Sequence, residues 1–349
     1  MIDTKKTFII LFVSSLFILS TCDKNKFQKF ESGSFDLFDT YSNIIIYAES
    51  REEAEKISGA IYARLGELHK LFDIYNAYDG INNLKTLNDN AGVAPVEVCG
   101  EMIELLKFSI DSYRETDGAF DVALGPVLSI WRAYREEGLL DPESASVPPY
   151  EMLKEASDFC DITKIMIDEI NHTVFLEQEG MSVDVGAVAK GFAAQLAIDE
   201  IIKESGVPCL IDLGGNIAAI GGPPGRSRTG GAWNVGVWDP LGVAGYIKIV
   251  AVTDLSVVTS GDYQRYYEAG GARYNHIVDP KTLIPADGFR SVTVIHPDSG
   301  VADMLSTAMF ILSYEEGSEL AEKFGAGALW VTRGGEQITN GEFDKYIVR

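Results

Sequence analysis

The sequence predicts an α+β protein with largely antiparallel sheets and packed helices. Helical and strand-like segments follow one another along the 349 residues without the regular strand–helix–strand alternation of a doubly wound fold. Residues 35–47 read as a strand pair or one long strand, and residues 265–274 read as a hairpin. Apolar content is ordinary for a globular protein, so the chain can bury a sizeable core.

Residues 1–21 form a targeting segment that stands outside the fold. Two lysines precede a short apolar run within residues 5–19, which is too short to span a membrane comfortably. The small residues before Cys22 resemble a bacterial lipoprotein signal with Cys22 as the lipidated residue; the alternative is an ordinary secretory signal. Residues 22–34 are then a polar tether, and residues 35–349 form one folded domain. This predicts a protein anchored by lipid to the bacterial inner membrane and facing the periplasm.

Charge and cysteine content exclude several classes of function. The formal net charge is −23, so nucleic acids and anionic membrane surfaces are not expected partners. A phosphorylated ligand would be repelled, and the sequence shows no cluster of phosphate-binding Lys or Arg, so a bound divalent cation is expected. Cys99, Cys160 and Cys209 have neither disulfide nor metal-ligand spacing and are expected in the core.

In the first half of the domain, helices are predicted where apolar residues recur every three to four positions. They cover residues 51–72, 101–116, 131–140 and 150–157. His69, among charged neighbours on the first helix, is expected to be solvated or to cap rather than to bind a ligand. An Asn-rich segment at residues 76–90 reads either as a binding loop or as a connector, and prolines mark a surface loop at 141–149.

In the second half, short apolar or alternating runs predict strands that turn residues separate. The predicted strands cover residues 172–176, 181–183, 209–213, 218–220, 233–238, 246–252, 255–259, 291–295 and 328–331. Helices are predicted over residues 189–203, 301–313 and 314–324. A stretch rich in Gly and Pro at residues 221–231 is expected to be a loop.

The segment from Asp184 to Ala193 is the stretch around which the chain is organised. Its small residues allow a close approach to the backbone, and the predicted helix that follows presents unpaired N–H groups suited to a phosphate. Asp184 and Lys190 bracket the turn with opposite charges. The alternative is a turn that is packed with small residues for steric reasons alone.

Three further positions are candidates for chemistry, each with a structural alternative. His276 lies at a strand end beside a turn, where it is either a general base or a residue that holds the turn. Asp303 and Thr307 are four apart on one helix face, where they either bind Mg²⁺ or stabilise the helix itself. Residues 214–216, Gly-Gly-Asn after a strand, permit close approach to a ligand. The sequence contains no dinucleotide-binding, P-loop, serine-hydrolase, zinc-protease or CxxC motif.

In chain order, six motifs resemble those of the ApbE family, the FAD:protein FMN transferases. They are Phe120-Asp121-Val122 with Gly125-Pro126, residues 184–191, residues 212–216, residues 259–263 with Arg265, residues 276–280, and Ala302-Asp303 with residues 305–307. Six matches in family order are far more specific than one. Leu283 departs from the pattern, because a glycine usually follows the Asp-Pro-x-Thr run, and it reads as loop variation.

The resemblance implies an ApbE-like flavin transferase fold and an enzyme that moves the FMN moiety of FAD onto a Thr or Ser hydroxyl of a target protein, releasing AMP. It implies a Mg²⁺ ion bound by the Ala187 carbonyl, Asp303 and Thr307. It also implies that His276 takes the proton from the acceptor hydroxyl. The implied FAD contacts are Phe38, Tyr75, Ala119, Phe120, Asp121, Asp184, Lys190 and Ile277. Target proteins in the family carry the pattern Asp-x-x-(Ser/Thr)-Gly-(Ala/Ser)-(Ser/Thr).

Two rival functions stay open from the sequence. Water as the acceptor would make the protein a Mg²⁺-dependent FAD pyrophosphatase that gives FMN and AMP. The second rival is a lipid-anchored protein that binds FAD without catalysing a reaction. The presence of both His276 and Asp303 argues against it. For the pyrophosphatase, Asn76 beside Tyr75 is interpreted as a pocket-edge residue whose small side chain leaves room for water near the metal.

Overall fold

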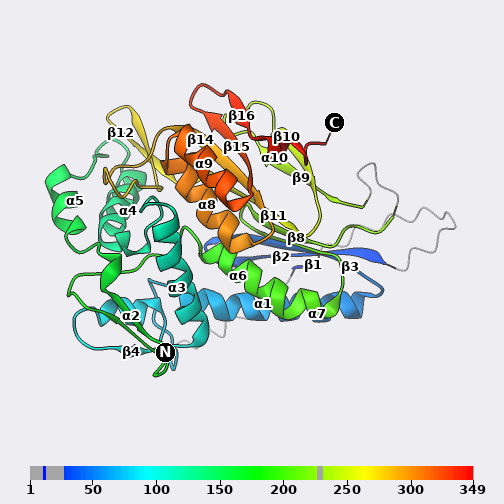
Figure 1. The fold of residues 1–349 in the computed structure, drawn as a ribbon, viewed down its shortest axis with the longest axis horizontal. Coiled ribbons are helices and arrows are strands. Elements are labelled where there is room, and N and C mark those ends of the chain that lie inside the picture. Colours follow the sequence, from blue (N-terminus) through cyan, green and yellow to red (C-terminus); the bar gives the residue numbers. More distant parts are fainter. Residues whose placement is uncertain (1–10, 13–26, 226–230, 349) are drawn as a thin grey trace.

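The computed structural model describes residues 11–12, 27–225 and 231–348, and its centre is a nine-stranded sheet (Figure 1). In spatial order the strands are β1 (Leu11–Phe12), β2 (Gln28–Leu37), β3 (Thr40–Ala48), β7 (Cys209–Leu213), β8 (Asn216–Ile220), β11 (Leu255–Gly261), β14 (Phe289–His296), β15 (Gly327–Thr332) and β16 (Gln337–Thr339). All strand pairs recorded in these ranges are antiparallel. The predicted α+β class is therefore confirmed.

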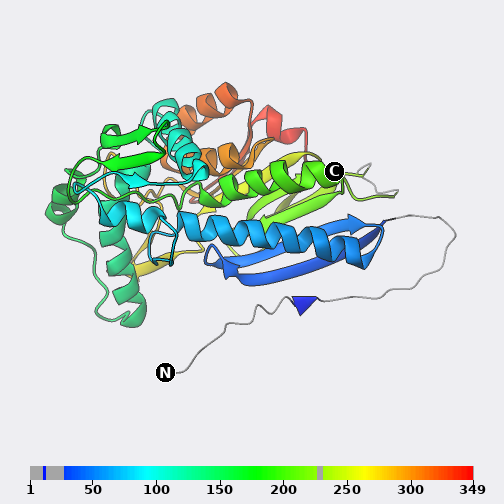
Figure 2. The same cartoon turned by 90° about the horizontal axis from the view of Figure 1, so that it is seen from below.

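One face of this sheet is covered by four helices, α1 (Arg51–Phe72), α6 (Ala189–Ala197), α8 (Ser299–Ile311) and α9 (Tyr314–Phe324) (Figures 1 and 2). α1 has the predicted bounds, because the Ser50 side chain accepts a hydrogen bond from the Glu53 N–H at its start and its apolar residues share one face. α6 packs against α8, and α8 packs on β11 and β14. This packing brings the segment at residues 184–191 next to the helix that carries Asp303.

A second, mostly helical lobe lies beside the sheet, on the left of Figure 1. It consists of α2 (Leu84–Asp89), α3 (Gly100–Glu115), α4 (Gly125–Leu140), α5 (Tyr150–Ser157) and the small sheet of β4 (Val96–Glu97), β5 (Ile165–Asp168) and β6 (Thr173–Leu176). The hairpin of β12 (Tyr266–Ala269) and β13 (Ala272–Asn275) packs on α4. α4 begins before the predicted position at Trp131, because Pro126 is tolerated in the first turn, where its missing N–H has no helical partner to lose.

The opposite face of the nine-stranded sheet is covered by the hairpin of β9 (Trp233–Trp238) and β10 (Tyr246–Val252) together with α10 (Gly341–Asp344). Trp233, Val257 and Phe343 belong to the apolar cluster between these elements and the sheet. Both strands of the hairpin have the predicted bounds. Along β9, buried residues alternate strictly with exposed or half-buried ones, which is the pattern that predicted a strand.

The hairpin of β2 and β3 corrects the predicted start of the folded domain. β2 begins at Gln28 and pairs with β3 from Gln28↔Ala48 onward, so residues 28–34 belong to the hairpin and not to the tether. The sequence conceals this strand because only Ser32 and Leu37 of its ten residues are buried. At the turn, the Nδ1 atom of His69 accepts a hydrogen bond from the Phe38 N–H at 3.2 Å. His69 therefore caps the turn, as one of its predicted roles allows.

Several other segments differ from the prediction, and one settles an alternative that the sequence left open. The helix predicted over residues 189–203 changes at Ile198–Ile202 into a π-helical turn, and α7 (Lys203–Ser205) follows. Residues 181–183 form no strand, whereas β5 was not predicted. Within the Asn-rich segment, Asn83 and Thr86 form a capping box that starts α2, so this part of the segment is a structural connector.

The three thiols of the folded domain and the N-terminal segment were also the subject of sequence predictions. Cys209 is buried on β7, Cys99 and Cys160 are only partly buried, and all three are free. Cys22 lies outside the described residues, so its lipidation stays a prediction. Within the described ranges, no helix is both long enough and apolar enough to cross a membrane.

Candidate active site

A cavity of about 440 Å³ is bounded by α4 of the second lobe, by α6 and α8, and by loops at the end of the central sheet. Its size lies in the range of small-molecule binding sites. The sequence-predicted residues in its wall are Tyr75, Ala119, Phe120, Asp121, Asp184, Ala187, Lys190, His276, Ile277, Asp303 and Thr307. Tertiary structure thus brings nearly all of the predicted site into one place.

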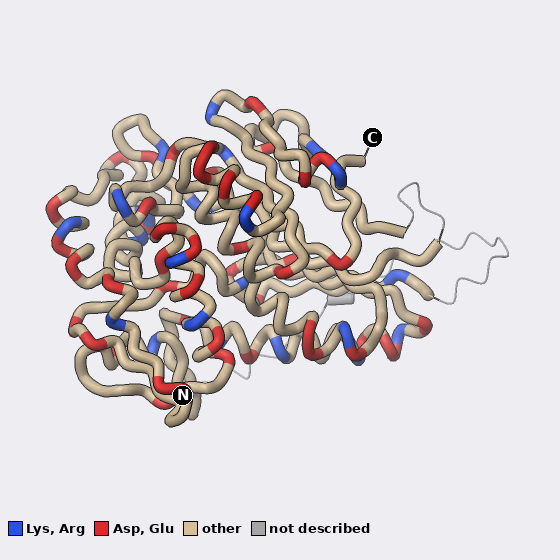
Figure 3. Tube along the Cα trace, in the orientation of Figure 1, with Lys and Arg blue, Asp and Glu red and all other residues tan. Residues whose placement is uncertain are grey.

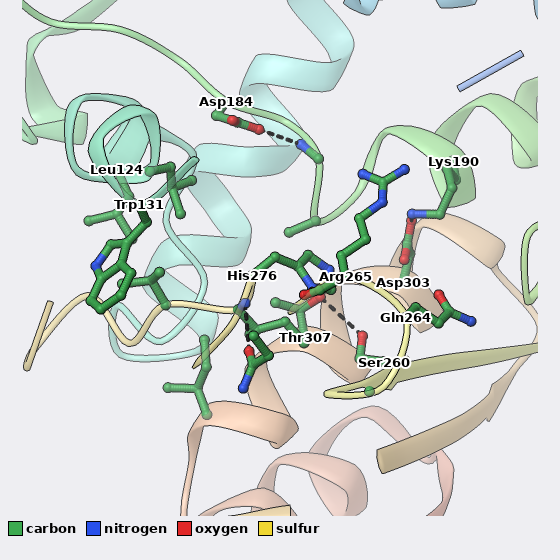
Figure 4. Close-up of a pocket in the computed structure, with 18 of the residues that line it drawn as sticks. Leu124, Trp131, Asp184, Lys190, Ser260, Gln264, Arg265, His276, Asp303 and Thr307 are labelled. Atoms are coloured by element: carbon green, nitrogen blue, oxygen red, sulfur yellow. Dashed lines mark hydrogen bonds and ion pairs between the residues drawn. The ribbon is translucent and has the colours of Figure 1, made fainter. Parts of the chain in front are cut away.

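The cavity has a charged end and an apolar end. Figure 4 shows Lys190 and Asp303 side by side at one end and Leu124 and Trp131 at the other, with His276 between them. Such a division suits an elongated ligand that carries anionic groups in one part and an aromatic ring in another.

Asp303 joins the two segments that form the charged end. Its Oδ2 atom accepts a hydrogen bond from the Gly191 N–H at 2.9 Å and lies 3.9 Å from Lys190 Nζ. A Cβ atom on residue 191 would lie 2.2 Å from the Ser299 carbonyl oxygen, so only glycine permits this approach of α6 to α8. Burial raises the pKa of Asp303, against the opposing effects of Lys190 and the Gly191 N–H. The carboxylate is therefore buried without a fully compensating positive charge.

The oxygen atoms around Asp303 fit a small divalent cation. Thr307 lies one turn further along α8, with its hydroxyl 3.4 Å from that of Ser260, and Ala187 lies in the same wall. These are hard oxygen donors, and Mg²⁺ typically takes only one or two protein carboxylates beside phosphate and water oxygens. In the part of the chain that the structure describes, no group of three or more His, Cys, Asp or Glu has metal-site geometry. A softer metal such as zinc therefore has no comparable ligand set there.

Asn216 is a polar residue at this end whose role sequence reasoning left undefined. Its side chain is buried, and its Oδ1 atom accepts a hydrogen bond from the Ser299 hydroxyl at 2.9 Å. The amide is close enough to the Asp303 carboxylate to lower the pKa of Asp303, but its Nδ2 atom makes no hydrogen bond of normal geometry with any described group. A buried donor without a partner is costly, so an anionic ligand oxygen at this place would satisfy it.

His276 is oriented as a proton acceptor. Its Nδ1 atom lies 3.2 Å from the Arg265 carbonyl oxygen, which can only accept, so Nδ1 carries the proton and Nε2 keeps its lone pair. Burial, followed by the charges of Arg265, Lys190 and Arg135, lowers the pKa of His276 to about 3. The imidazole is therefore neutral at neutral pH, as a general base must be.

Arg132 connects two of the predicted FAD contacts. Its guanidinium donates to Asp184 Oδ2 at 2.7 Å and lies over the Tyr75 ring, 4.6 Å from the ring centroid. The other oxygen of Asp184 accepts the Gly186 N–H at 2.9 Å. Asp184 therefore fixes both the turn at the start of α6 and the arginine that stacks on Tyr75.

The apolar end is built around Trp131. Its indole stacks on Tyr274, with 5.7 Å between ring centroids, and its Nε1–H donates to the Leu283 carbonyl at 2.8 Å. Leu283 has a φ of +62°, a left-handed conformation that glycine adopts at little cost. This explains why a glycine is usual at the position, and the buried Leu283 side chain compensates by joining the Trp131 cluster.

Asp121 also lines the cavity and is perturbed by its surroundings. Burial is the main cause that raises the pKa of Asp121 to about 6, and nearby Asp161 adds to the effect. The Ala123 N–H, which donates to Asp121 at 2.8 Å, acts in the opposite direction. A carboxylate in this state can exchange a proton near neutral pH.

Two residues that were predicted at this cavity lie outside its wall. Phe38 is not part of the wall, because its ring packs edge-on against His69, with 5.4 Å between centroids; its neighbours Asp39 and Thr40 line the cavity instead. Asn76 does not line the cavity either. Its amide nitrogen donates to Asp73 Oδ2 at 3.0 Å, so this side chain holds the Tyr75 loop.

The positive charge of the cavity also differs from what the sequence suggested. The sequence was expected to lack a cluster of phosphate-binding Lys or Arg, yet Arg132, Arg135 and Arg265 line the cavity together with Lys190. Sequence reasoning missed the cluster because its members come from α4, α6 and the loop before β12. The signal that was available is the spacing of Arg132 and Arg135, three apart on a predicted helix and hence on one face.

Comparison with known proteins identifies the family. The model of the ApbE family matches residues 38–330. The chain belongs to the ApbE family. The FAD:protein FMN transferase of Treponema pallidum (strain Nichols) is 36% identical over 297 residues, which cover 80% of each chain.

Solved ApbE structures agree with the fold described above. The crystal structure of the ApbE protein from Thermotoga maritima MSB8 matches with a TM-score of 0.80 and 29% identity, covering 92% of this chain and all of that one. The apo form of the flavinyl transferase ApbE from Pseudomonas stutzeri matches with a TM-score of 0.75 and 27% identity, covering 94% and 98% of the two chains. The expected ApbE-like fold is therefore confirmed.

Proposed function

We propose that this ApbE-family protein is an FAD:protein FMN transferase that moves the FMN moiety of FAD onto a Thr or Ser hydroxyl of a target protein with the help of Mg²⁺. The observation that carries the proposal is the meeting of a neutral His276, a buried Asp303 and Lys190 in one cavity of suitable size. Several curated relatives carry the name of this enzyme, including one at 36% identity.

Different parts of the cavity would bind different parts of FAD. The apolar end with Trp131 and Leu124 and the stacked pair of Tyr75 and Arg132 offer aromatic and apolar surface for ring systems. The charged end offers Lys190 and the unpartnered Asn216 amide to the phosphate oxygens. A Mg²⁺ ion would be held by Asp303, Thr307 and the Ala187 carbonyl; when bound, such an ion neutralises phosphate charge and stabilises a phosphate leaving group.

His276 supplies the proton acceptor for the transfer. In the reaction, the bond between the FMN phosphorus and the bridging oxygen breaks and that oxygen leaves with AMP, while a new bond forms between the FMN phosphorus and the target hydroxyl oxygen. The hydroxyl proton passes to Nε2 of His276, which the Nδ1 contact with the Arg265 carbonyl leaves free. Positioning and charge stabilisation contribute more than covalent help in such phosphoryl transfers.

The test is incubation of the purified protein with FAD, Mg²⁺ and a peptide that carries the pattern Asp-x-x-Thr-Gly-Ala-Thr. Flavin fluorescence that stays on the peptide through a denaturing separation, with one AMP released per FMN attached, supports transfer. AMP and free FMN without labelled peptide would mean that water is the acceptor and that the protein is a pyrophosphatase. FAD recovered intact with every cation tested would leave only an FAD-binding role.

We also propose that the protein is a lipoprotein of the bacterial inner membrane that faces the periplasm, anchored through Cys22. The proposal rests on the apolar run and the small residues before Cys22. Cys22 precedes Gln28, the first residue of β2, by six positions, which span at most about 20 Å. Replacing Cys22 with Ser should release the protein from the membrane fraction, and retention of that variant would contradict the anchor.

A further inference from the structure

Arg132, Arg135 and Arg265 form an unusual basic group, which we name the arginine rim. All three line the cavity, and the pKa of Arg135 is lowered by burial and by the nearby charges of the other two. Figure 3 shows acidic residues spread over helices and loops of a chain whose net charge is −23. Three like charges gathered at one place in such a chain repel one another and favour the arrival of an anion.

The rim has more positive charge than its protein neighbours neutralise. Arg132 is paired with Asp184. Arg265 donates only to the Asp39 carbonyl at 3.3 Å, and the Arg135 side chain makes no hydrogen bond or ion pair with any residue that the structure describes. Guanidinium groups stay charged at all ordinary pH values, so two of the three cations have no carboxylate partner.

The rim lies beside solvent-exposed residues at the edge of the cavity. Arg132 lies over Tyr75, whose side chain is half exposed, and Arg265 reaches the exposed Asp39. Asp303, by contrast, is buried at the other end of the cavity beside Lys190. If the proposed function holds, the two phosphates of FAD belong with Asp303, Lys190 and the Asn216 amide. Arg132 is held by Asp184 over Tyr75, so Arg135 and Arg265 are left to a second anion.

Resting on the proposed function, we infer that the arginine rim binds an acidic side chain of the target protein, close in sequence to the hydroxyl that receives FMN. A guanidinium group pairs with a carboxylate through two parallel hydrogen bonds, which fixes orientation as well as adding affinity. The position of the rim around His276 would place the neighbouring hydroxyl near the imidazole. The rim also provides a local attraction that offsets the repulsion of an acidic segment by the rest of the chain.

The inference is tested by binding without FAD. Three fluorescent peptides share one Thr and differ at one earlier position, which is Asp, Asn or Lys. Their affinities for the full-length protein and for its R135Q and R135E variants are measured by fluorescence anisotropy. R114E is the matched control, because Arg114 is exposed on α3, pairs only with Asp111 and lies outside the cavity.

We expect the wild-type protein and R114E to bind the Asp peptide about tenfold more tightly than the Asn peptide, the size of one charge-assisted contact. R135Q should remove most of this preference, and R135E should reverse it in favour of the Lys peptide. An unchanged preference in folded R135E would overturn the inference. So would an R135E protein that binds FAD tenfold more weakly than wild type, because the rim would then hold phosphates.

Adding FAD and Mg²⁺ to the same samples separates this inference from the proposed function. If the Asp peptide binds preferentially but acquires no FMN, the transferase proposal fails and the rim inference stands. If the Asp and Asn peptides bind equally and acquire FMN at equal rates, the transferase proposal stands and the rim inference fails.

Discussion

The N–H of Gly191 donates a hydrogen bond of 2.9 Å to the carboxylate of Asp303, although 112 positions separate the two residues. The bond closes the charged end of the cavity, because Gly191 lies in the first turn of α6 and Asp303 in α8. The segment at residues 184–191 and the helix that carries Asp303, which are far apart in the sequence, are thus neighbours. The contact depends on the absence of a side chain at position 191.

Replacing Gly191 with Ala should therefore lower the free energy of unfolding by about 1–3 kcal/mol, the usual cost of overpacking. The new Cβ would lie 2.2 Å from the Ser299 carbonyl and 2.6 Å from the Asp303 Cβ. Gly59 is the matched control, since it also lies in a helix but a Cβ there meets nothing within 4 Å. Urea unfolding should show Gly59→Ala to be neutral or stabilising; equal destabilisation by both changes would contradict the packing argument.

Asp303→Asn should separate stability from activity. Burial raises the pKa of Asp303, so its charge destabilises the protein without bound metal, and the neutral amide should keep or increase the free energy of unfolding. The same change should abolish Mg²⁺-dependent FAD cleavage. Unfolding in the presence of EDTA and AMP release from FAD are the two measurements. A marked loss of stability in EDTA would show that Asp303 acts mainly in holding α6 to α8.

Arg132→Gln should weaken FAD binding by about tenfold, because Asp184 and Tyr75 would lose the guanidinium that bonds to the first and stacks on the second. Arg132→Lys should restore little, because an ammonium group cannot stack as a planar guanidinium does. Quenching of FAD fluorescence measures the affinity. Arg114→Gln removes an arginine of equal charge outside the cavity and should have no effect.

His276→Gln should slow FMN transfer by roughly 10²–10⁴-fold, the range expected for loss of a positioned base. FAD affinity should change far less, because the imidazole contributes a proton-transfer step more than a binding contact. Single-turnover measurement of labelled peptide at saturating FAD isolates this step. A variant that transfers FMN at the wild-type rate would remove His276 from the mechanism.

The stability of the protein should respond to pH in opposite directions through His276 and Asp121. The pKa of His276 falls from 6.5 to about 3 on folding, so its contribution is present above pH 6.5 and is lost as the pH falls toward 3. The pKa of Asp121 rises from 3.8 to about 6, so its contribution is present below pH 3.8 and is lost as the pH rises through 6. Between pH 4 and 6 the two contributions oppose each other, so the free energy of unfolding should rise less, or fall more, with increasing pH in His276→Gln than in wild type, and should rise more in Asp121→Asn.

The sequence by itself determined the elements whose evidence is local. α1 and α5 have their predicted bounds, because amphipathic spacing is written into the residues of the helix. β7, β9 and β10 are equally well predicted from apolar or alternating runs. The motifs that carry His276, Asp184, Lys190 and Asp303 could be found because the family resemblance is read position by position along the chain.

Only the tertiary structure decided what depends on elements that are distant in sequence. Few residues of β2 are buried, so the polar sequence of residues 28–34 predicted a tether. This segment is a strand because β3 pairs with it. Phe38 turns toward His69, a neighbour that only the docking of α1 supplies. The arginine rim gathers side chains from α4 and from the loop before β12. The spacing of Arg132 and Arg135 indicates a shared helix face, but only packing brings Arg265 to them.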